Sequence, residues 1–147
     1  MAESTLHQQL VKGLAQLVQS SRLGPWFLLL DSRDFSHGHA GVPPSLEDVR
    51  PDLYAVEIES RHVVIGEAKT PLDLENMHTE KQLEIYFQHI SKQASGHIEL
   101  AVSLSCAGAA HALCRAARHR TSTNVPFRVS GWLFGPGGMS FHEAWNG

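Results

Sequence analysis

The stretch RPDLYAVEIESRHVVIGEAK, residues 50–69, decides how this chain folds. It contains two apolar runs, 52–57 and 62–69, and the polar residues 58–61 between them predict two strands joined by a turn. The second run centres on Val63-Val64-Ile65 and is apolar on both faces, which is typical of a strand inside a sheet. An acidic residue begins the first strand, and an acid and a lysine close the second.

The spacing of these charged residues brings them together if the two strands form an antiparallel hairpin. With Glu59 and Ser60 at the middle of the turn, opposing residues have numbers that sum to 119, and Asp52 lies opposite Glu67. Lys69 lies two residues beyond Glu67 and therefore points to the same face. The turn contains no glycine that would fix this register, and a slip of one residue would move Asp52 to the other face unless a bulge restored it.

The elements around this hairpin predict an α/β domain. The apolar periodicity of 4–21 and 79–94 indicates helices, and Gly96 is expected to stop the second of them. The remaining expected elements are strands at 26–30, 97–104 and 127–134, an alanine-rich helix at 107–120, a linker at 71–77, a turn at 135–138 and an edge strand at 139–142. We therefore expect a mixed sheet flanked by helices, in one domain spanning residues 1–147.

A long polar loop is predicted between the first two strands. Residues 31–48 contain two glycines and two prolines, and a loop of this length in a small domain is usually functional or mobile. His37 and His39 lie within it. We interpret them as part of a solvated tip rather than as a pair of metal ligands.

The composition is that of an ordinary globular domain. The 147 residues are 42% hydrophobic and 18% charged, without an apolar run long enough for a membrane span. No secretory signal is visible, and Cys106 and Cys114 lack zinc-ligand spacing and are too few for a disulfide framework. We expect a cytoplasmic protein without membrane association. The net charge of −3 argues against a protein coated in positive charge, but it allows a local basic patch that binds phosphates.

Two carboxylates at one end of an apolar hairpin predict a metal site. Clustered carboxylates repel one another unless a cation neutralises them. Oxygen ligands favour a hard ion such as Mg²⁺, with Mn²⁺ as a substitute, held by Asp52 and Glu67 with water in the remaining positions. Such an ion lowers the pKa of bound water, and Lys69 is placed to orient that water or offset charge. The alternative is an ordinary Glu67–Lys69 pair at a strand end.

Pro51-Asp52, Glu67-Ala68-Lys69 and the later Gln82-Leu-Glu-Ile-Tyr86 together resemble the PD-(D/E)XK nuclease superfamily. The resemblance covers about two-thirds of the chain. It is closest to single-domain members of the Holliday-junction-resolvase and replication-repair kind, with a Gln-x-x-x-Tyr motif similar to that of the RecB-like branch. It implies a restriction-endonuclease-like αβββαβ core within residues 4–104, followed by an added helix and a C-terminal β-hairpin.

The resemblance also implies roles for individual residues. Asp52 and Glu67 would bind Mg²⁺, Lys69 would assist the attacking water, and Gln82 and Tyr86 would fix the site or the substrate. Two of these assignments have structural alternatives. Gln82 completes a capping box that starts at Thr79, in which it would reach back to the Thr79 backbone, and Tyr86 suits the core equally well.

Many members of the superfamily also carry an acid on the first helix. The only acid available here is Glu3, which is the candidate third metal ligand and, alternatively, a partner of the helix dipole. The positions that would face the site from this helix hold His7 and Gln9. His7 shares a stripe with Leu10 and Leu14, one helical turn after Glu3.

Contacts with nucleic acid are predicted at four further positions. Thr70 directly follows the lysine, and His78 precedes the helix expected above the site. Arg115 and Arg118 lie in the only dense basic stretch, for which the alternative is a solvated helix face.

These observations predict a Mg²⁺-dependent nuclease acting on DNA or RNA, with DNA as the expected partner. A homodimer is also expected, because one small domain grips little duplex. The main alternative is a non-catalytic module on the same fold that binds nucleic acid or protein through a degenerate site. A small-molecule enzyme using Glu67 and Lys69 as acid and base is a third possibility.

Overall fold

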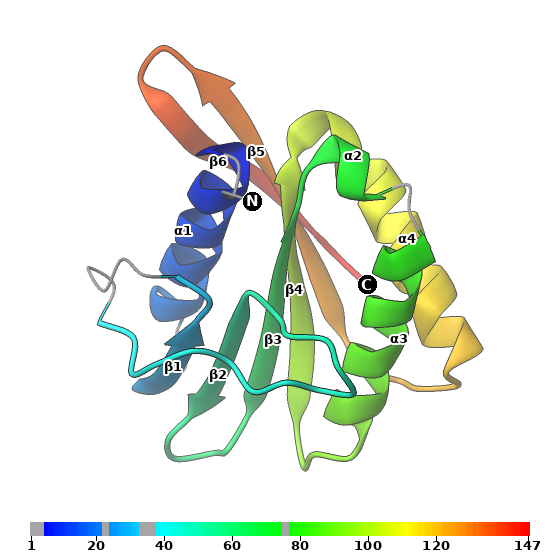
Figure 1. The fold of residues 1–147 in the computed structure, drawn as a ribbon. Helices are drawn as coiled ribbons and strands as arrows, with labels where there is room; N and C mark the ends of the chain where they lie inside the picture. The colour runs from blue at the N-terminus through cyan, green and yellow to red at the C-terminus, as the bar shows by residue number, and fades with distance from the viewer. Residues whose placement is uncertain (1–4, 22–23, 33–37, 75–76) are drawn as a thin grey trace.

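A single mixed sheet with helices on both faces forms the protein (Figure 1). The computed structural model describes residues 5–21, 24–32, 38–74 and 77–147. Its elements are α1 (Thr5–Gln19), β1 (Trp26–Leu30), β2 (Leu53–Glu57), β3 (Val63–Lys69), α2 (Pro71–Leu74), α3 (Met77–Ser91), β4 (Gly96–Ser103), the 3₁₀ turn η2 (Leu104–Cys106), α4 (Ala107–Arg120), β5 (Phe127–Gly135) and β6 (Gly138–Asn146). The predicted α/β class and mixed sheet are confirmed.

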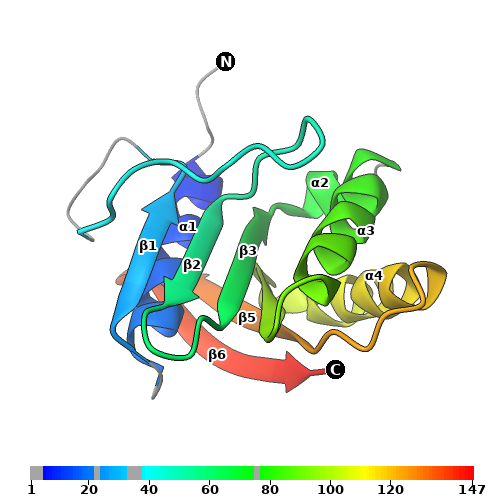
Figure 2. The same ribbon diagram turned by 90° about the horizontal axis from the view of Figure 1, so that it is seen from below.

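The six strands lie in sequence order, β1 to β6, in one curled sheet. β1, β2 and β3 are antiparallel to one another, β3, β4 and β5 are parallel, and β6 returns antiparallel to β5. All seven residues of β3 are buried, as predicted for a strand inside the sheet. Figure 2 shows β1, β2 and β3 side by side, with α1 against one face and α3 and α4 on the other side.

The register of the central hairpin confirms the predicted pairing. Leu53 pairs with Gly66 and Val56 with Val63, so that opposing residue numbers sum to 119. A side chain at position 66 would crowd α1, because a Cβ would lie 2.7 Å from Cδ2 of Leu14 and 3.1 Å from Cβ of Leu53. The close packing of α1 on β3 therefore depends on a glycine at this point.

Apolar side chains form two separate cores, one on each face of the sheet. Alternating residues of β3 divide between them, because successive strand residues point to opposite faces. The core under α3 and α4 includes Val63, Ile65, Leu83 and Phe87, among others. The core under α1 includes the following residues: Leu10, Leu14, Leu28, Leu53, Val64, Ala68 and Trp132. None of the helices in the described ranges is long and apolar enough to cross a membrane.

Most elements begin or end within a few residues of the predicted bounds, and three differences have a clear physical reason. The expected linker 71–77 contains the short helix α2, where Thr70 donates its N–H and its hydroxyl to Oδ2 of Asp73 (3.3 and 2.7 Å) just before a proline at the first helical position. Gly96 does not stop α3, which ends at Ser91. It begins β4 instead, where a Cβ would lie 2.6 Å from the Val63 carbonyl oxygen.

The third difference is the last strand, which extends to Asn146 rather than ending at residue 142. The apolar signal of this segment is weak because most of its described residues are exposed. The extent of β6 is instead defined by its pairing with β5 over nearly its whole length. The register of this pairing shifts at Gly131/Trp132.

The loop before β2 is partly buried. Backbone hydrogen bonds join the loop to β1: the N–H of Leu30 in β1 donates to the Gly41 carbonyl, and the N–H of Ala40 in the loop donates to the Leu28 carbonyl. Val49, later in the loop, packs into the core under α3. His39 is only 5% exposed, and its Nε2 lies 3.1 Å from the Ser32 carbonyl oxygen, so the interpretation as a solvated tip is wrong for His39. His37 lies outside the described residues.

The packing of α1 on β3 generates a prediction about stability. We expect Gly66→Ala to lower the free energy of unfolding by about 1–3 kcal/mol, because the added methyl group overpacks the α1 core. Gly41→Ala is the matched control: its Cβ would lie 3.8 Å from Leu29 Cδ2, an ordinary contact. Urea unfolding of both variants measures the difference, and equal stabilities would contradict the packing described.

Candidate functional site

The open end of the β2–β3 hairpin brings Asp52 and Glu67 together. The backbone N–H of Asp52 donates to Oε1 of Glu67 (3.2 Å), and the N–H of Ala68 donates to Oδ2 of Asp52 (2.9 Å). Each carboxylate is thus held by the backbone of the opposite strand. The two residues are 7% and 3% exposed, so both carboxyl groups lie within the protein rather than in bulk water.

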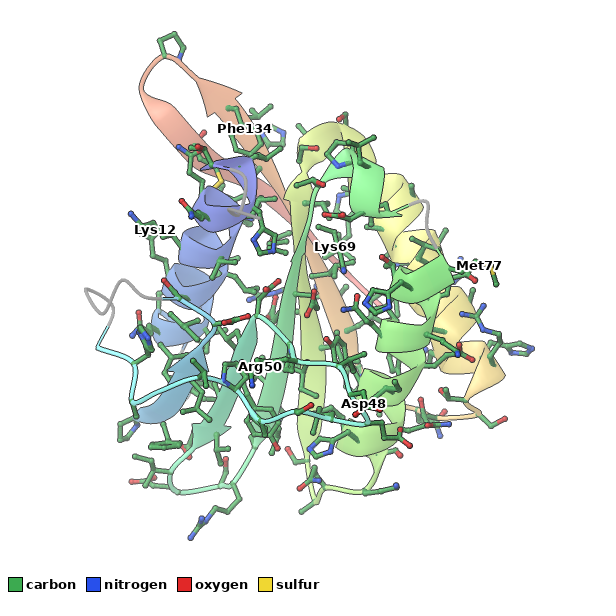
Figure 3. All side chains as sticks on the ribbon, in the orientation of Figure 1. Lys12, Asp48, Arg50, Lys69, Met77 and Phe134 are labelled. Carbon is green, nitrogen blue, oxygen red and sulfur yellow. The ribbon has the colours of Figure 1, made fainter. Side chains whose placement is uncertain are left out.

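Three further side chains converge on Glu67 from β3 and α3. The Tyr86 hydroxyl donates to Oε1 (2.8 Å), and Lys69 Nζ lies 3.4 Å from Oε2. Lys69 also donates to Oε1 of Gln82 (2.5 Å), and Figure 3 shows Lys69 in the space between β3 and the helices. Gln82 and Tyr86 are four residues apart and lie on one face of α3, directed at the strand.

The electrostatics of this cluster show a shortage of positive charge. Burial, and then the neighbouring carboxylate of Asp52, raise the pKa of Glu67 to about 8, although Lys69 and Tyr86 act in the opposite direction. Burial and the Glu67 carboxylate also raise the pKa of Tyr86. Glu67 therefore keeps a proton at neutral pH, even though Lys69 Nζ lies 3.4 Å from its carboxyl group.

A residue of α1 completes the site. His7 Nε2 lies 3.2 Å from Oδ2 of Asp52, and the pair is partly buried. The sequence contained the signal for this contact, because His7 shares the inward stripe of the helix with Leu10 and Leu14. The helix position that faces Asp52 therefore holds an imidazole.

The structure decides between the alternatives for α3. This helix begins at Met77, two residues before Thr79, so Thr79 is not its N-cap and the predicted capping box is wrong. The Gln82 side chain contacts Lys69 instead. Tyr86 takes both of its predicted places, since it is fully buried in the core and its hydroxyl reaches Glu67.

The remaining predicted residues are not brought into this cluster. Thr70 is engaged with Asp73, and His78 is exposed on the first turn of α3. Arg115 is exposed on α4, while Arg118 lies over the Phe127 ring (4.8 Å to the centroid) and donates to the Val125 carbonyl (3.4 Å). Because Phe127 pairs with Ile98 near the start of β4, Arg118 lies at the opposite end of the sheet from the cluster.

The donor set at this end suits a hard divalent cation. Within residues 5–21, 24–32, 38–74 and 77–147, no three residues among His, Cys, Asp and Glu form a group that could hold a metal ion, and Glu3 lies outside these ranges. Mg²⁺, however, typically uses one or two carboxylates and completes its shell with water. Asp52 and Glu67 provide two carboxylates, and the raised pKa of Glu67 marks a place where added positive charge is favourable.

Comparisons with protein-family models, with curated proteins and with solved structures gave no match for this chain. The function is therefore inferred from the geometry of the site.

The raised pKa of Glu67 predicts a pH dependence of stability. Its pKa is about 8 in the folded protein against about 4.5 normally, so the folded state retains a proton that the unfolded state has lost. Stability is therefore expected to fall as pH rises from about 4.5 to 8, by up to about 1.4 kcal/mol per pH unit.

Glu67→Gln should remove this loss of stability, because the amide keeps an acceptor for Tyr86 without titrating. Glu59→Gln, at an exposed turn carboxylate, is the control and should keep the wild-type profile. Denaturant unfolding between pH 5 and 8.5 measures the profiles. An unchanged profile in Glu67→Gln would show that this carboxyl does not retain its proton on folding.

Proposed function

We propose that this protein is a Mg²⁺-dependent nuclease of the PD-(D/E)XK type, hydrolysing phosphodiester bonds in DNA. The observation that carries the proposal is the convergence of Asp52, Glu67 and Lys69 at one end of a buried hairpin, with Lys69 Nζ 3.4 Å from the Glu67 carboxylate. In sequence these residues matched only a short motif. The contacts between them support a common role.

The arrangement of the sheet also supports this proposal. A helix, three antiparallel strands, a helix and a strand parallel to the third follow one another through β4, apart from the short α2. This order resembles the αβββαβ core of the superfamily. The later elements, α4 and the β5–β6 hairpin, would then be additions to that core.

The residues of the site have separable roles under this proposal. Asp52 and Glu67 would hold the cation, which when bound supplies an activated water and stabilises charge on the phosphate. Lys69 would donate to the water or to a phosphate oxygen. Gln82 orients the Lys69 ammonium, and Tyr86 fixes one oxygen of Glu67 by hydrogen bonding, which leaves the other oxygen facing Lys69.

A binding module without catalytic activity is the second candidate function. It is favoured by the contact of His7 with Asp52, since the first helix offers an imidazole where related nucleases often carry an acid. Such a module would bind nucleic acid or a protein partner through the same surface without cleaving it.

Cleavage assays with site variants distinguish the two functions. We expect the wild-type protein to cleave DNA with Mg²⁺ or Mn²⁺, and EDTA to abolish the activity. Lys69→Ala and Asp52→Ala should each lower the rate by at least about 100-fold, because each removes electrostatic stabilisation at the reacting phosphate. Lys12→Ala, on the exposed face of α1, is a matched lysine control that should retain activity.

Thermal unfolding establishes that each variant is folded. Equal cleavage by the wild type and both site variants would contradict the nuclease proposal. DNA binding by the folded wild-type protein, with no cleavage by it in Mg²⁺ or Mn²⁺, would favour the binding module.

A further inference from the structure

A second chain of polar residues lies at the opposite end of the sheet from the candidate nuclease site. His62 precedes β3, Ser95 precedes β4, and His97 and Glu99 belong to β4. Lys69 ends β3, so seven residues, or about 20 Å of strand, separate His62 from Lys69. The register places His97 beside Val64 and Glu99 beside Gly66, on the face that α1 covers.

Hydrogen bonds connect these residues in one continuous series. The Ser95 hydroxyl contacts Nδ1 of His62, and His62 Nε2 lies 2.7 Å from Nδ1 of His97. His97 Nε2 lies 3.0 Å from Oε1 of Glu99. Arg128, on β5, closes the series with two contacts to Glu99, from Nε to Oε2 (3.0 Å) and from a terminal guanidinium nitrogen to Oε1 (2.7 Å).

The buried end of the series fixes the direction of its hydrogen bonds. Glu99 is 1% exposed and paired with Arg128, so its carboxylate only accepts. His97 then donates from Nε2 to Glu99, and its Nδ1 accepts from His62 Nε2–H. Nδ1 of His62 is in turn left as an acceptor, and it faces the Ser95 hydroxyl. Ser95 therefore lies next to a histidine base whose tautomer is fixed by its hydrogen bond to His97.

This arrangement meets the geometric requirement for an activated serine. A nucleophilic hydroxyl needs a base within hydrogen-bonding distance and a third group that orients the base. Ser95 is exposed, so reagents in solution can reach its oxygen. Beside the base lies a cavity of about 280 Å³ with polar and apolar walls, lined in part by His62, His97, Trp26 and Phe127.

We propose that Ser95 is a nucleophile toward small carboxylic esters, with His62 as its general base and His97 and Glu99 as positioning residues. Ser95 Oγ forms a bond to the ester carbonyl carbon while its proton passes to Nδ1 of His62. The bond to the alcohol oxygen breaks, and the alcohol leaves with that proton. Water then attacks the acyl-serine, His62 takes and returns one proton, and the products are the carboxylic acid and free Ser95.

Several charged groups around His62 determine its protonation. Burial, and then the nearby His97, lower the pKa of His62, and Glu57 on β2 acts in the opposite direction. Glu99 on β4 and Arg128 on β5 lie behind His97 and form a neutral pair. The base therefore remains in its accepting form to a lower pH than a free histidine.

An active-site-directed organophosphorus fluoride tests the proposal directly on the full chain. Its phosphorus forms a bond to an activated serine oxygen and fluoride leaves as HF. We expect one adduct per wild-type chain, mapped to Ser95 by peptide mass spectrometry, and none in Ser95→Ala. His62→Gln should slow labelling by about 100-fold. Ser105→Ala, at another exposed serine, should label like the wild type.

The pH profile separates positioning from a merely structural role. Labelling should fall at acid pH with a single midpoint. His97→Gln should move that midpoint upward, because burial and then His97 lower the pKa of His62 and the variant removes the second of these causes. Hydrolysis of p-nitrophenyl acetate should fall at least tenfold in Ser95→Ala.

Lys69→Ala should label normally, so loss of nuclease activity leaves this test intact. No adduct on the wild type, or an adduct on another residue, would overturn the proposal.

Discussion

The register between β2 and β3 brings the two acidic residues of the candidate site together. Leu53 pairs with Gly66, and continuing that pairing by one residue places Asp52 beside Glu67. The same glycine lets Leu14 approach the sheet, which seats α1 and brings His7 to Asp52. The pairing of β2 with β3 thus positions Asp52 and Glu67, and the glycine within it lets α1 place His7 beside them.

The consequence of this register is electrostatic. Two carboxylates lie buried at a strand end with one lysine between β3 and α3 to balance them, and burial keeps the Glu67 carboxyl protonated toward pH 8. An arrangement that serves stability alone would place fewer charges in the core, because buried charge is costly to desolvate. The desolvation cost of these buried charges is explained if a bound divalent cation takes the place of the proton on Glu67.

The sequence contained most of the information for this site because its signals are local. The apolar run of β3 identified a buried strand, and a count of residues across one turn placed Asp52 opposite Glu67. The Gln-x-x-x-Tyr spacing put two polar side chains on one face of α3. Each inference needed only a short stretch of chain and the period of one element.

The features that could not be predicted depend on long-range pairing. The series from Ser95 to Arg128 needs the parallel register of β3, β4 and β5, which brings together residues 33 positions apart, and His-x-Glu in a strand carries no such signal. His39 is likewise buried because its loop pairs with β1, a contact between segments that the local sequence does not predict. The length of β6 is set by its partner strand rather than by its own apolar pattern.

Crystals grown with Mn²⁺ would show whether Asp52 and Glu67 hold a divalent cation, because this ion scatters anomalously and substitutes for Mg²⁺. We expect one anomalous peak about 2.0–2.3 Å from an oxygen of Asp52 and an oxygen of Glu67, with water in the remaining positions. The peak should disappear in Asp52→Ala. Density that shows Glu67 bound only to Tyr86 and Lys69 at saturating Mn²⁺, with no peak beside Asp52, would contradict this expectation.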